Sequence, residues 1–295
     1  MSHADKLRLR LRSGRLLTSR QGSFKGKLCS SRLWTDEKYR QRHGGPPVHG
    51  SFKRTMLQEP CKNMQQHMVD RKELARLVAS TGADVPQEAL EPLGIYLEML
   101  CQWNKAMNLV GPHSWQNMLT RLVADSFHLA PFLSGLPMPA APLTWDLGAG
   151  AGLPGIPLRM LWPDGSYYMV EVREKRALFL SSVLSRTHLP CTHVFRGPVE
   201  HFFQGQYYQA DCIVSRAFMP WRQLLDLTLP RLRREGHLVI LALEPAPEKL
   251  PTPWRVAAQH SYTAAGSGRW FWALSPDLPE NDLKTFSAGQ HDDGA

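Results

Sequence analysis

The sequence lacks the cysteine pattern of a disulfide-stabilised protein or of a zinc protein. Its five cysteines are odd in number, lie far apart and form no Cys-x-x-Cys pair, and its twelve histidines show no metal-ligand spacing. We therefore expect no metal site and a reducing compartment, the cytoplasm. No apolar run approaches the roughly 18 residues that a transmembrane helix needs. The first residues are basic rather than apolar, so we expect neither a membrane span nor a secretory signal.

Acidic residues are scarce at the N-terminus. Residues 1–60 contain 14 Lys and Arg against 4 Asp and Glu, and the rest of the chain holds the other 21 basic and 22 acidic residues. Residues 1–68 are also rich in Ser and Gly and poor in apolar clusters, which is typical of a basic, disordered tail. Three interpretations are open: a solvated tail, including one created by a start ahead of Met56, Met64 or Met68; an arm for RNA phosphates; or an organelle transit peptide.

Glycine is concentrated in one stretch, Thr144 to Pro157, which reads TWDLGAGAGLPGIP. A short apolar run ends in Asp146, and Gly148, Gly150 and Gly152 follow at alternate positions. This order predicts a strand, a tight glycine loop and a helix, because glycine permits positive φ and the close approach of a ligand to the backbone. Free N–H groups at a helix start attract anionic groups. The stretch therefore predicts a nucleotide-like ligand.

Helical patterns precede this stretch. Leucines spaced three and four residues apart predict a helix from Pro86 to Met107, and Ser114 is a candidate N-cap for a second helix. The segment from Trp103 to Leu109 fits the C-terminal end of the first helix, where Lys105 would face the negative end of the helix dipole. A proline-rich joint, Leu136 to Pro142, separates these helices from the glycine loop.

Strands and helices alternate after the loop. The predicted helices cover Lys175–Leu189, with Leu178 mostly inward, and Trp221–Arg234; the predicted strands cover Tyr167–Val172, Thr192–Arg196, Asp211–Ser215, His237–Leu243, Trp254–Ala257 and Arg269–Leu274. Such alternation predicts a mostly parallel, doubly wound α/β sheet with its ligand outside the carboxyl ends of the strands. We expect a tail over 1–68, a helical region over 69–135, a sheet domain over 140–278 and a flexible tail over 279–295.

Two classes of ligand fit the glycine loop. The residues from Gly150 to Gly155 match G-x-G-x-x-G, and Glu171 lies about twenty residues downstream, where a dinucleotide enzyme places its ribose acid. Asp146, however, would repel a pyrophosphate and could hold a cationic amino group, and the glycine series begins earlier, at Gly148. We therefore favour S-adenosylmethionine. A nicotinamide-dependent oxidoreductase and a glycine-rich turn without a ligand remain alternatives.

Further motifs accompany the loop. They are K-R-x-x-F-L from Lys175, S-R-A-F from Ser215, W-N-K-x-x-N-L from Trp103 and the pair Asp125-Ser126. Together with D-L-G-A-G-A-G-L-P-G-I-P-L, they resemble the small-subunit ribosomal RNA guanine-N7 methyltransferase family, also called the glucose-inhibited division protein B family, over about residues 70 to 275. The resemblance implies a class I, Rossmann-like methyltransferase fold with an N-terminal helical extension. It also implies methylation of guanine N7 in small-subunit ribosomal RNA, or in the 30S particle, by a monomer.

The resemblance also implies roles for individual residues. The methionine and ribose side of the cofactor would contact Asp146, Gly148, Gly150, Gly152 and Leu153; Glu171 would take the ribose hydroxyls; Val199 and Glu200 would hold the adenine edge; and Lys105, Lys175, Arg176 and Phe218 would contact RNA. Arg216 would be the catalytic residue and would contact an RNA phosphate or the cofactor carboxylate. Two alternatives are open: Arg216 could form a structural ion pair with Asp125 or Asp211, and Phe218, like Trp221, could pack in the core.

Direct transfer to guanine N7 would need no general base, because N7 carries a lone pair and no proton, so the protein's task would be alignment. Three departures from the family pattern bear on this activity. Leu122 stands where a histidine is usual, Pro198 replaces an arginine, and Glu244-Pro245 replace a lysine and a glycine. The last exchange places an anion close to the expected RNA. It keeps open a non-catalytic RNA-binding or ribosome-assembly factor on the same scaffold.

Overall fold

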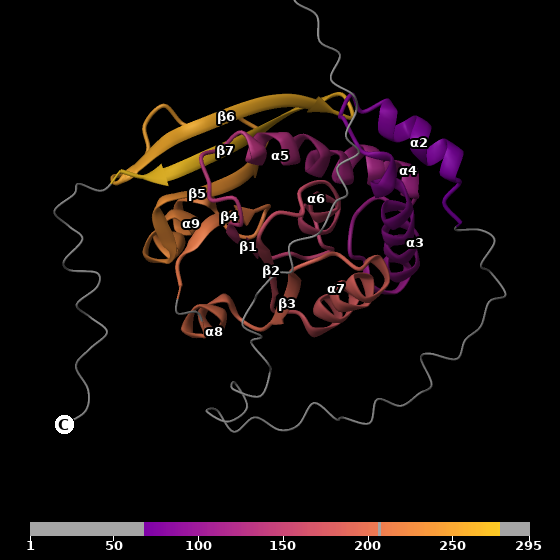
Figure 1. Cartoon of the computed structure of the whole chain (residues 1–295), viewed down its shortest axis with the longest axis horizontal. Coiled ribbons are helices and arrows are strands. Elements are labelled where there is room, and N and C mark those ends of the chain that lie inside the picture. The colour runs from indigo at the N-terminus through magenta and orange to yellow at the C-terminus, as the bar shows by residue number, and fades with distance from the viewer. Residues whose placement is uncertain (1–67, 206–207, 278–295) are drawn as a thin grey trace, which may run out of the picture. The chain divides into compact units, whose positions relative to one another are not determined.

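The computed structural model describes residues 68–205 and 208–277 (Figure 1). The tail predicted over 1–68, Met68 apart, and the tail predicted over 279–295 lie outside these residues.

A seven-stranded sheet with the order β3-β2-β1-β4-β5-β7-β6 forms the centre of the fold. The first five strands in this order are parallel, and β7 runs antiparallel to both β5 and β6. The strands are β1 Leu143–Leu147, β2 Ser166–Glu171, β3 Thr192–Arg196, β4 Ala210–Ser215, β5 Leu232–Ala242, β6 Trp254–Ala264 and β7 Ser267–Pro276. The mostly parallel sheet predicted from the alternating pattern is confirmed.

Helices cover both faces of this sheet. They are α2 Arg71–Ala79, η3 Gln87–Ala89, α3 Leu90–Met107, α4 Trp115–Met118, the π-helical turn η4 Leu119–Val123, α5 Ala124–Ser134, α6 Gly155–Leu161, α7 Glu174–Thr187, α8 Val199–Gln204, α9 Trp221–Thr228 and η5 Leu229–Arg231. The predicted helix from Pro86 to Met107 is confirmed as η3 followed by α3. The Ser114 hydroxyl caps α4 by accepting from the Asn117 N–H at 3.4 Å.

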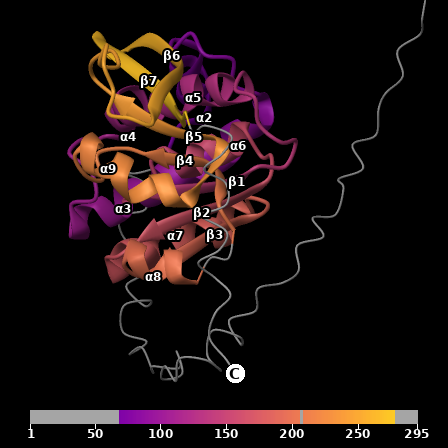
Figure 2. The same cartoon turned by 90° about the vertical axis from the view of Figure 1, so that its left-hand side faces the viewer.

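The core is divided by the sheet because neighbouring strand residues point to opposite faces. On β4, Cys212 and Val214 pack with the helices from α2 to α7, whereas Ile213 packs on the other face with α8 and α9. Both views place α5 against the hairpin of β6 and β7 (Figure 1 and Figure 2). The helices upstream of the glycine loop therefore share one core with the sheet.

Several predicted boundaries are wrong. The helix predicted to reach Arg234 ends at Thr228, and Leu232 already begins β5. Pro230 explains this change, because proline has no N–H to continue a helix.

Leu178, predicted to point mostly inward, is exposed on the outer side of α7. The last two strands are longer than predicted, since polar residues on their open side hide their periodicity.

Candidate functional site

The glycine loop joins β1 to α6, as the sequence predicts. Gly148, Gly150 and Gly152 have φ of +74°, +59° and +79°, a region that favours glycine. The N–H groups of Gly148 and Ala149 both donate to the carbonyl of Val170, at 3.0 and 3.1 Å. The loop is thereby fastened to the end of β2.

The three glycines face different surroundings. A Cβ added at Gly148 would lie 2.4 Å from the Phe218 ring, and one at Gly152 would lie 2.4 Å from the Ile156 side chain. A Cβ at Gly150 would meet nothing closer than 3.7 Å, where the Arg176 guanidinium lies. A side chain at Gly148 or Gly152 would thus clash with its neighbours, whereas a Cβ at Gly150 would make only ordinary van der Waals contacts.

Glu171, at the end of β2, is bound to this loop. Its Oε2 accepts from the Gly150 N–H at 2.8 Å, and its Oε1 accepts from the Arg173 N–H at 2.8 Å. Because a carboxylate can accept about four hydrogen bonds, each oxygen retains capacity for a ligand hydroxyl. The Gly197 N–H donates to the Glu171 carbonyl at 3.1 Å, which brings the start of α8 beside the same residue.

Val172 is a further candidate site residue, which the sequence does not single out. Its side chain is 60% exposed although it is apolar, and it directly follows Glu171. In the sequence it reads as the last residue of the strand, so it gives no separate signal. An exposed apolar side chain beside the Glu171 carboxylate would suit the face of an aromatic ring of a ligand.

Asp146 differs from its predicted position. It is only 1% exposed and accepts from the Tyr167 hydroxyl at 3.1 Å, and a Cβ at Gly155 would lie 2.6 Å from its Oδ2. The carboxylate therefore supports the glycine loop from inside the protein, and does not line the open face of the loop. Burial raises the pKa of Asp146 to about 7, against the opposing hydrogen bonds from Tyr167 and the Gly155 backbone.

Asp146→Asn is expected to change how stability depends on pH. Since the native pKa is about 7 and the unfolded pKa lies near 4, native Asp146 keeps a proton that the unfolded chain releases between these values. Wild-type stability should therefore fall as the pH rises from about 4 to 7, by on the order of 3 kcal/mol, and then level off. An asparagine side chain cannot titrate, so the variant should lack this fall. Urea unfolding at pH 5, 6.5 and 8 without cofactor measures it; parallel pH curves for the two proteins would contradict the assignment.

Arg216 follows β4 and is held from two sides. Its Nη2 lies 3.3 Å from Asp125 Oδ2, and its Nη1 donates to the Leu122 carbonyl at 3.1 Å. Asp211, the other acid considered for this pair, instead pairs with Arg233 at 2.7 Å. The ion pair with Asp125 is thus present. Because Leu122 contributes its carbonyl, the missing histidine side chain at this position does not remove the contact.

The helices before the sheet also hold the glycine loop. The Tyr96 hydroxyl on α3 donates to the Ala151 carbonyl at 2.9 Å, and the Ser126 hydroxyl on α5 donates to the Pro154 carbonyl at 3.0 Å. The pair Asp125-Ser126 therefore connects α5 to both Arg216 and the loop. This helical region is part of the site.

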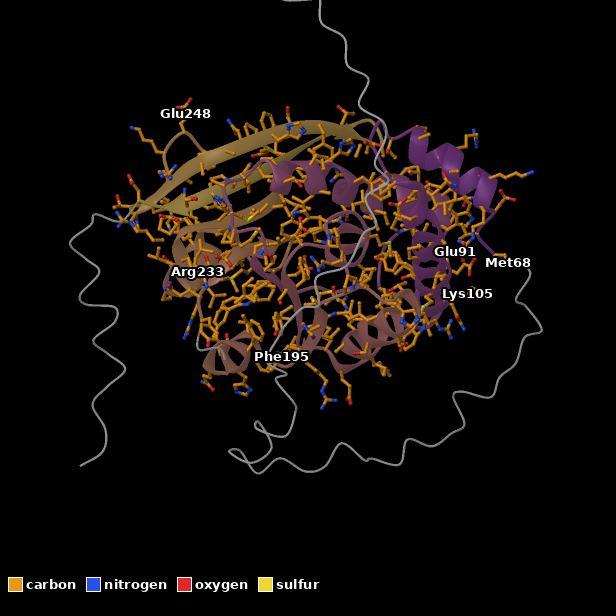
Figure 3. All side chains as sticks on the ribbon, in the orientation of Figure 1. Met68, Glu91, Lys105, Phe195, Arg233 and Glu248 are labelled. Carbon is orange, nitrogen blue, oxygen red and sulfur yellow. The ribbon has the colours of Figure 1, made fainter. Side chains whose placement is uncertain are left out.

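The remaining predicted residues fall into three groups. Leu153 and Val199 are buried, while Glu200 is exposed in the first turn of α8, so the predicted adenine-side turn is the start of a short helix. Arg176 reaches toward Gly150, and Lys175 is exposed beside it in the first turn of α7. Lys105 is exposed in the last turn of α3 (Figure 3). Phe218 is half-buried against Gly148, as the core alternative predicts.

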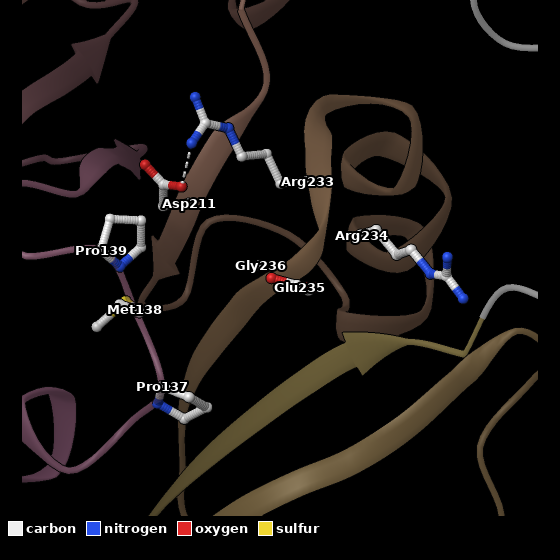
Figure 4. Close-up of a pocket in the computed structure, with 8 residues that line it drawn as sticks. All are labelled: Pro137, Met138, Pro139, Asp211, Arg233, Arg234, Glu235 and Gly236. Carbon is white, nitrogen blue, oxygen red and sulfur yellow. Dashed lines mark hydrogen bonds and ion pairs between the residues drawn. The ribbon is translucent and has the colours of Figure 1, made fainter. Parts of the chain in front are cut away.

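A cavity of about 500 Å³ lies at the amino ends of the parallel strands, beside the first residues of β4 and β5 (Figure 4). Asp211 and Arg233 line it, and they are paired with each other. The Leu143 N–H also donates to Asp211, at 2.8 Å. These polar groups already stabilise the fold, and the cavity is remote from the glycine loop.

Within 68–205 and 208–277, no cluster of three or more His, Cys, Asp or Glu could hold a metal ion, and no helix could span a membrane.

Comparison with known proteins assigns the chain to a family. It resembles TrmN from Thermus thermophilus, with 17% identity and a TM-score of 0.41, covering 52% of this chain and 48% of that one. It also resembles an MtNAS variant in complex with S-adenosylmethionine, with 13% identity and a TM-score of 0.45, covering 72% of this chain and 92% of that one. A family model described as rRNA small subunit methyltransferase G matches residues 89–251. The chain is 50% identical over 213 residues to the protein of that name from Nitratidesulfovibrio vulgaris, covering 72% of this chain and 97% of the relative. The chain belongs to the rRNA small subunit methyltransferase G family.

A second relative in this family, from Oleidesulfovibrio alaskensis, is 46% identical over 229 residues, 74% of this chain and 97% of that protein. Membership in the rRNA small subunit methyltransferase G family confirms the resemblance stated from the motifs and the class I methyltransferase fold. The chain is an rRNA methyltransferase, with S-adenosylmethionine as cofactor. The nicotinamide-dependent oxidoreductase is thereby excluded.

Proposed function

We propose that this methyltransferase acts on N7 of one guanine in small-subunit ribosomal RNA, as a monomer in the cytoplasm. The observation that carries the proposal is the glycine loop bonded to Glu171, with Arg216 following the carboxyl end of β4, the strand paired with β1. The S-R-A-F and L-P-G-I-P-L motifs, which the chain shares with guanine-N7 methyltransferases, support the choice of acceptor atom.

The residues around the loop suit the cofactor. Gly148, Gly150, Gly152 and Leu153 would line the methionine and ribose side, with Asp146 fixing the loop from beneath. Glu171 would accept from the ribose hydroxyls with its remaining lone pairs. Val172 would cover one face of the adenine, and the Val199-Glu200 segment would approach its edge, because Gly197 is bonded to Glu171.

The RNA would approach from the side of α3 and α7. Lys105, Lys175 and Arg176 would contact phosphates, and the two cations in the first turn of α7 oppose the helix dipole, which favours a role in binding over one in stability. Phe218 would contact the target nucleotide beside Gly148. Trp221, with the Arg222 guanidinium 4.4 Å from its ring centroid, offers a second surface for an unpaired base.

The protein's contribution to the reaction would be alignment. When bound at this loop, S-adenosylmethionine would supply a methyl group on a cationic sulfur, which the lone pair of guanine N7 could accept without a general base. Arg216 would act as the catalytic residue by holding an RNA phosphate or the cofactor carboxylate, so that the two reacting atoms lie in line. The glycine loop and the helices that contact it would exclude water from the two reacting atoms.

The proposal is tested by transfer of labelled methyl from S-adenosylmethionine to small-subunit RNA that lacks the modification, both as naked RNA and as assembled 30S particles. We expect label at N7 of a single guanine, found by nuclease digestion and mass analysis. Comparison of the two substrates shows which form is used. Label on another base or atom, or no label despite measurable cofactor binding, would contradict the proposed acceptor.

A further inference from the structure

The hairpin of β6 and β7 reaches the site through one hydrogen bond. The Tyr262 hydroxyl on β6 donates to Asp125 Oδ1 at 2.8 Å, and Asp125 Oδ2 lies 3.3 Å from Arg216 Nη2. Tyr262 lies outside residues 89–251, which the family model matches. A residue far along the chain therefore contacts the carboxylate that holds the arginine of the site.

Packing fixes the place of the Tyr262 ring. Asp125, His128 and Phe132 are spaced three and four residues apart, so they share one face of α5. His260 and Tyr262 share one face of β6, because side chains alternate along a strand. The His128 and Tyr262 rings stack with centroids 4.6 Å apart, and the Phe132 and His260 rings stack at 6.3 Å. The Tyr262 hydroxyl is thereby aimed at Asp125 by contacts that do not involve the hydroxyl itself.

The hydroxyl in turn limits how Asp125 can rotate. The Asp125 side chain is 4% exposed and that of Arg216 is 20% exposed, so water cannot readily replace either partner of the carboxylate. With Oδ1 held by Tyr262, the position of Oδ2 is fixed, and the attraction between Oδ2 and the guanidinium 3.3 Å away places the Arg216 side chain. Arg216 forms an ion pair with Asp125 and donates one of its five N–H groups to the Leu122 carbonyl, which leaves donors for a ligand.

We propose that Tyr262 is a positioning residue for methyl transfer. Through Asp125 it fixes the orientation of the Arg216 guanidinium at the carboxyl end of β4. This inference rests on the role proposed above for Arg216. It gives the C-terminal hairpin a function in the reaction in addition to its place in the core.

Tyr262→Phe tests the inference, because it removes the hydroxyl and leaves the ring stacking in place. We expect kcat to fall about tenfold, within the range that a small misplacement in an active site produces, while KM for S-adenosylmethionine stays within about twofold. The matched control is Ser275→Ala on β7, which removes a buried hydroxyl 2.9 Å from Nδ1 of His237. His237 lies in the middle of β5, away from the carboxyl ends of the parallel strands. The control should lower the unfolding temperature to a similar extent and leave kcat unchanged.

A double-mutant cycle with Arg216→Lys shows whether Tyr262 acts through the arginine. If it does, Tyr262→Phe should cause no further loss of kcat once Arg216 is replaced, because coupled residues are not additive. Additive losses, or equal kcat for Tyr262→Phe and the wild type, would overturn this inference alone. Absence of methyl transfer by the wild type would overturn the proposed function and this inference together.

Discussion

Gly150→Val is expected to abolish binding of S-adenosylmethionine while leaving the protein folded. Gly150 has a φ of +59°, which a β-branched residue adopts only with strain. The new side chain would also project toward Arg176, on the side of the loop where the cofactor is proposed to lie. We expect at least a thousandfold loss of affinity, about 4 kcal/mol, in a calorimetric titration with S-adenosylmethionine.

The matched control for this variant is Gly266→Val. Gly266 has a φ of +76°, so it shares the backbone strain of Gly150, and a Cβ there would meet no atom within 4 Å. It lies in the turn between β6 and β7, away from the glycine loop. Both variants should lose similar stability, but only Gly150→Val should lose the cofactor. Equal affinity of the two variants would remove the loop from the cofactor site.

Glu171→Gln should weaken cofactor binding about a hundredfold, although it changes only one atom. Both carboxylate oxygens accept from backbone N–H groups, of Gly150 and Arg173. An amide has only one oxygen, so its NH2 group must face one of these donors, and that donor loses its partner. The ribose hydroxyls would lose an acceptor as well. The loss of affinity corresponds to about 3 kcal/mol and should appear in the same titration.

Glu174→Gln is the matched control, three residues downstream. Glu174 makes an exposed ion pair with Arg196 at 2.7 Å, and such pairs contribute little to stability. The control should bind S-adenosylmethionine like the wild type. A Glu171→Gln variant that binds as tightly as this control would show that the Glu171 carboxylate does not hold the ribose.

The parts of the site that the sequence predicts are those with local causes. The glycine loop is predictable because alternate glycines after a short apolar run leave few other backbone arrangements. Glu171 is predictable because the carboxyl ends of neighbouring parallel strands meet at one edge of the sheet. The Ser114 cap and the helix ending at Met107 likewise depend on residues within a few positions of one another.

The parts that the sequence does not predict depend on distant contacts. The depth of Asp146 follows from packing against Tyr167, which belongs to the next strand. The bond between Asp125 and Tyr262 joins residues 137 positions apart, and neither residue has a local feature that indicates the other. The early start of β5 at Leu232 is hidden because apolar residues continue through Leu227 and Leu229, as they would in a longer helix.

The two hydroxyls that hold the glycine loop have a consequence for where the enzyme can be divided. Tyr96 and Ser126 belong to helices that precede the sheet, yet they bind the carbonyls of Ala151 and Pro154 within and just after the loop. A fragment that began at β1 would leave these carbonyls without partners. It would also lose the helices from α2 to α5, which pack on one face of the sheet. We therefore expect the smallest fragment that keeps the glycine loop in this arrangement to begin no later than α3, so the sheet alone could not be transplanted to another protein with the loop intact.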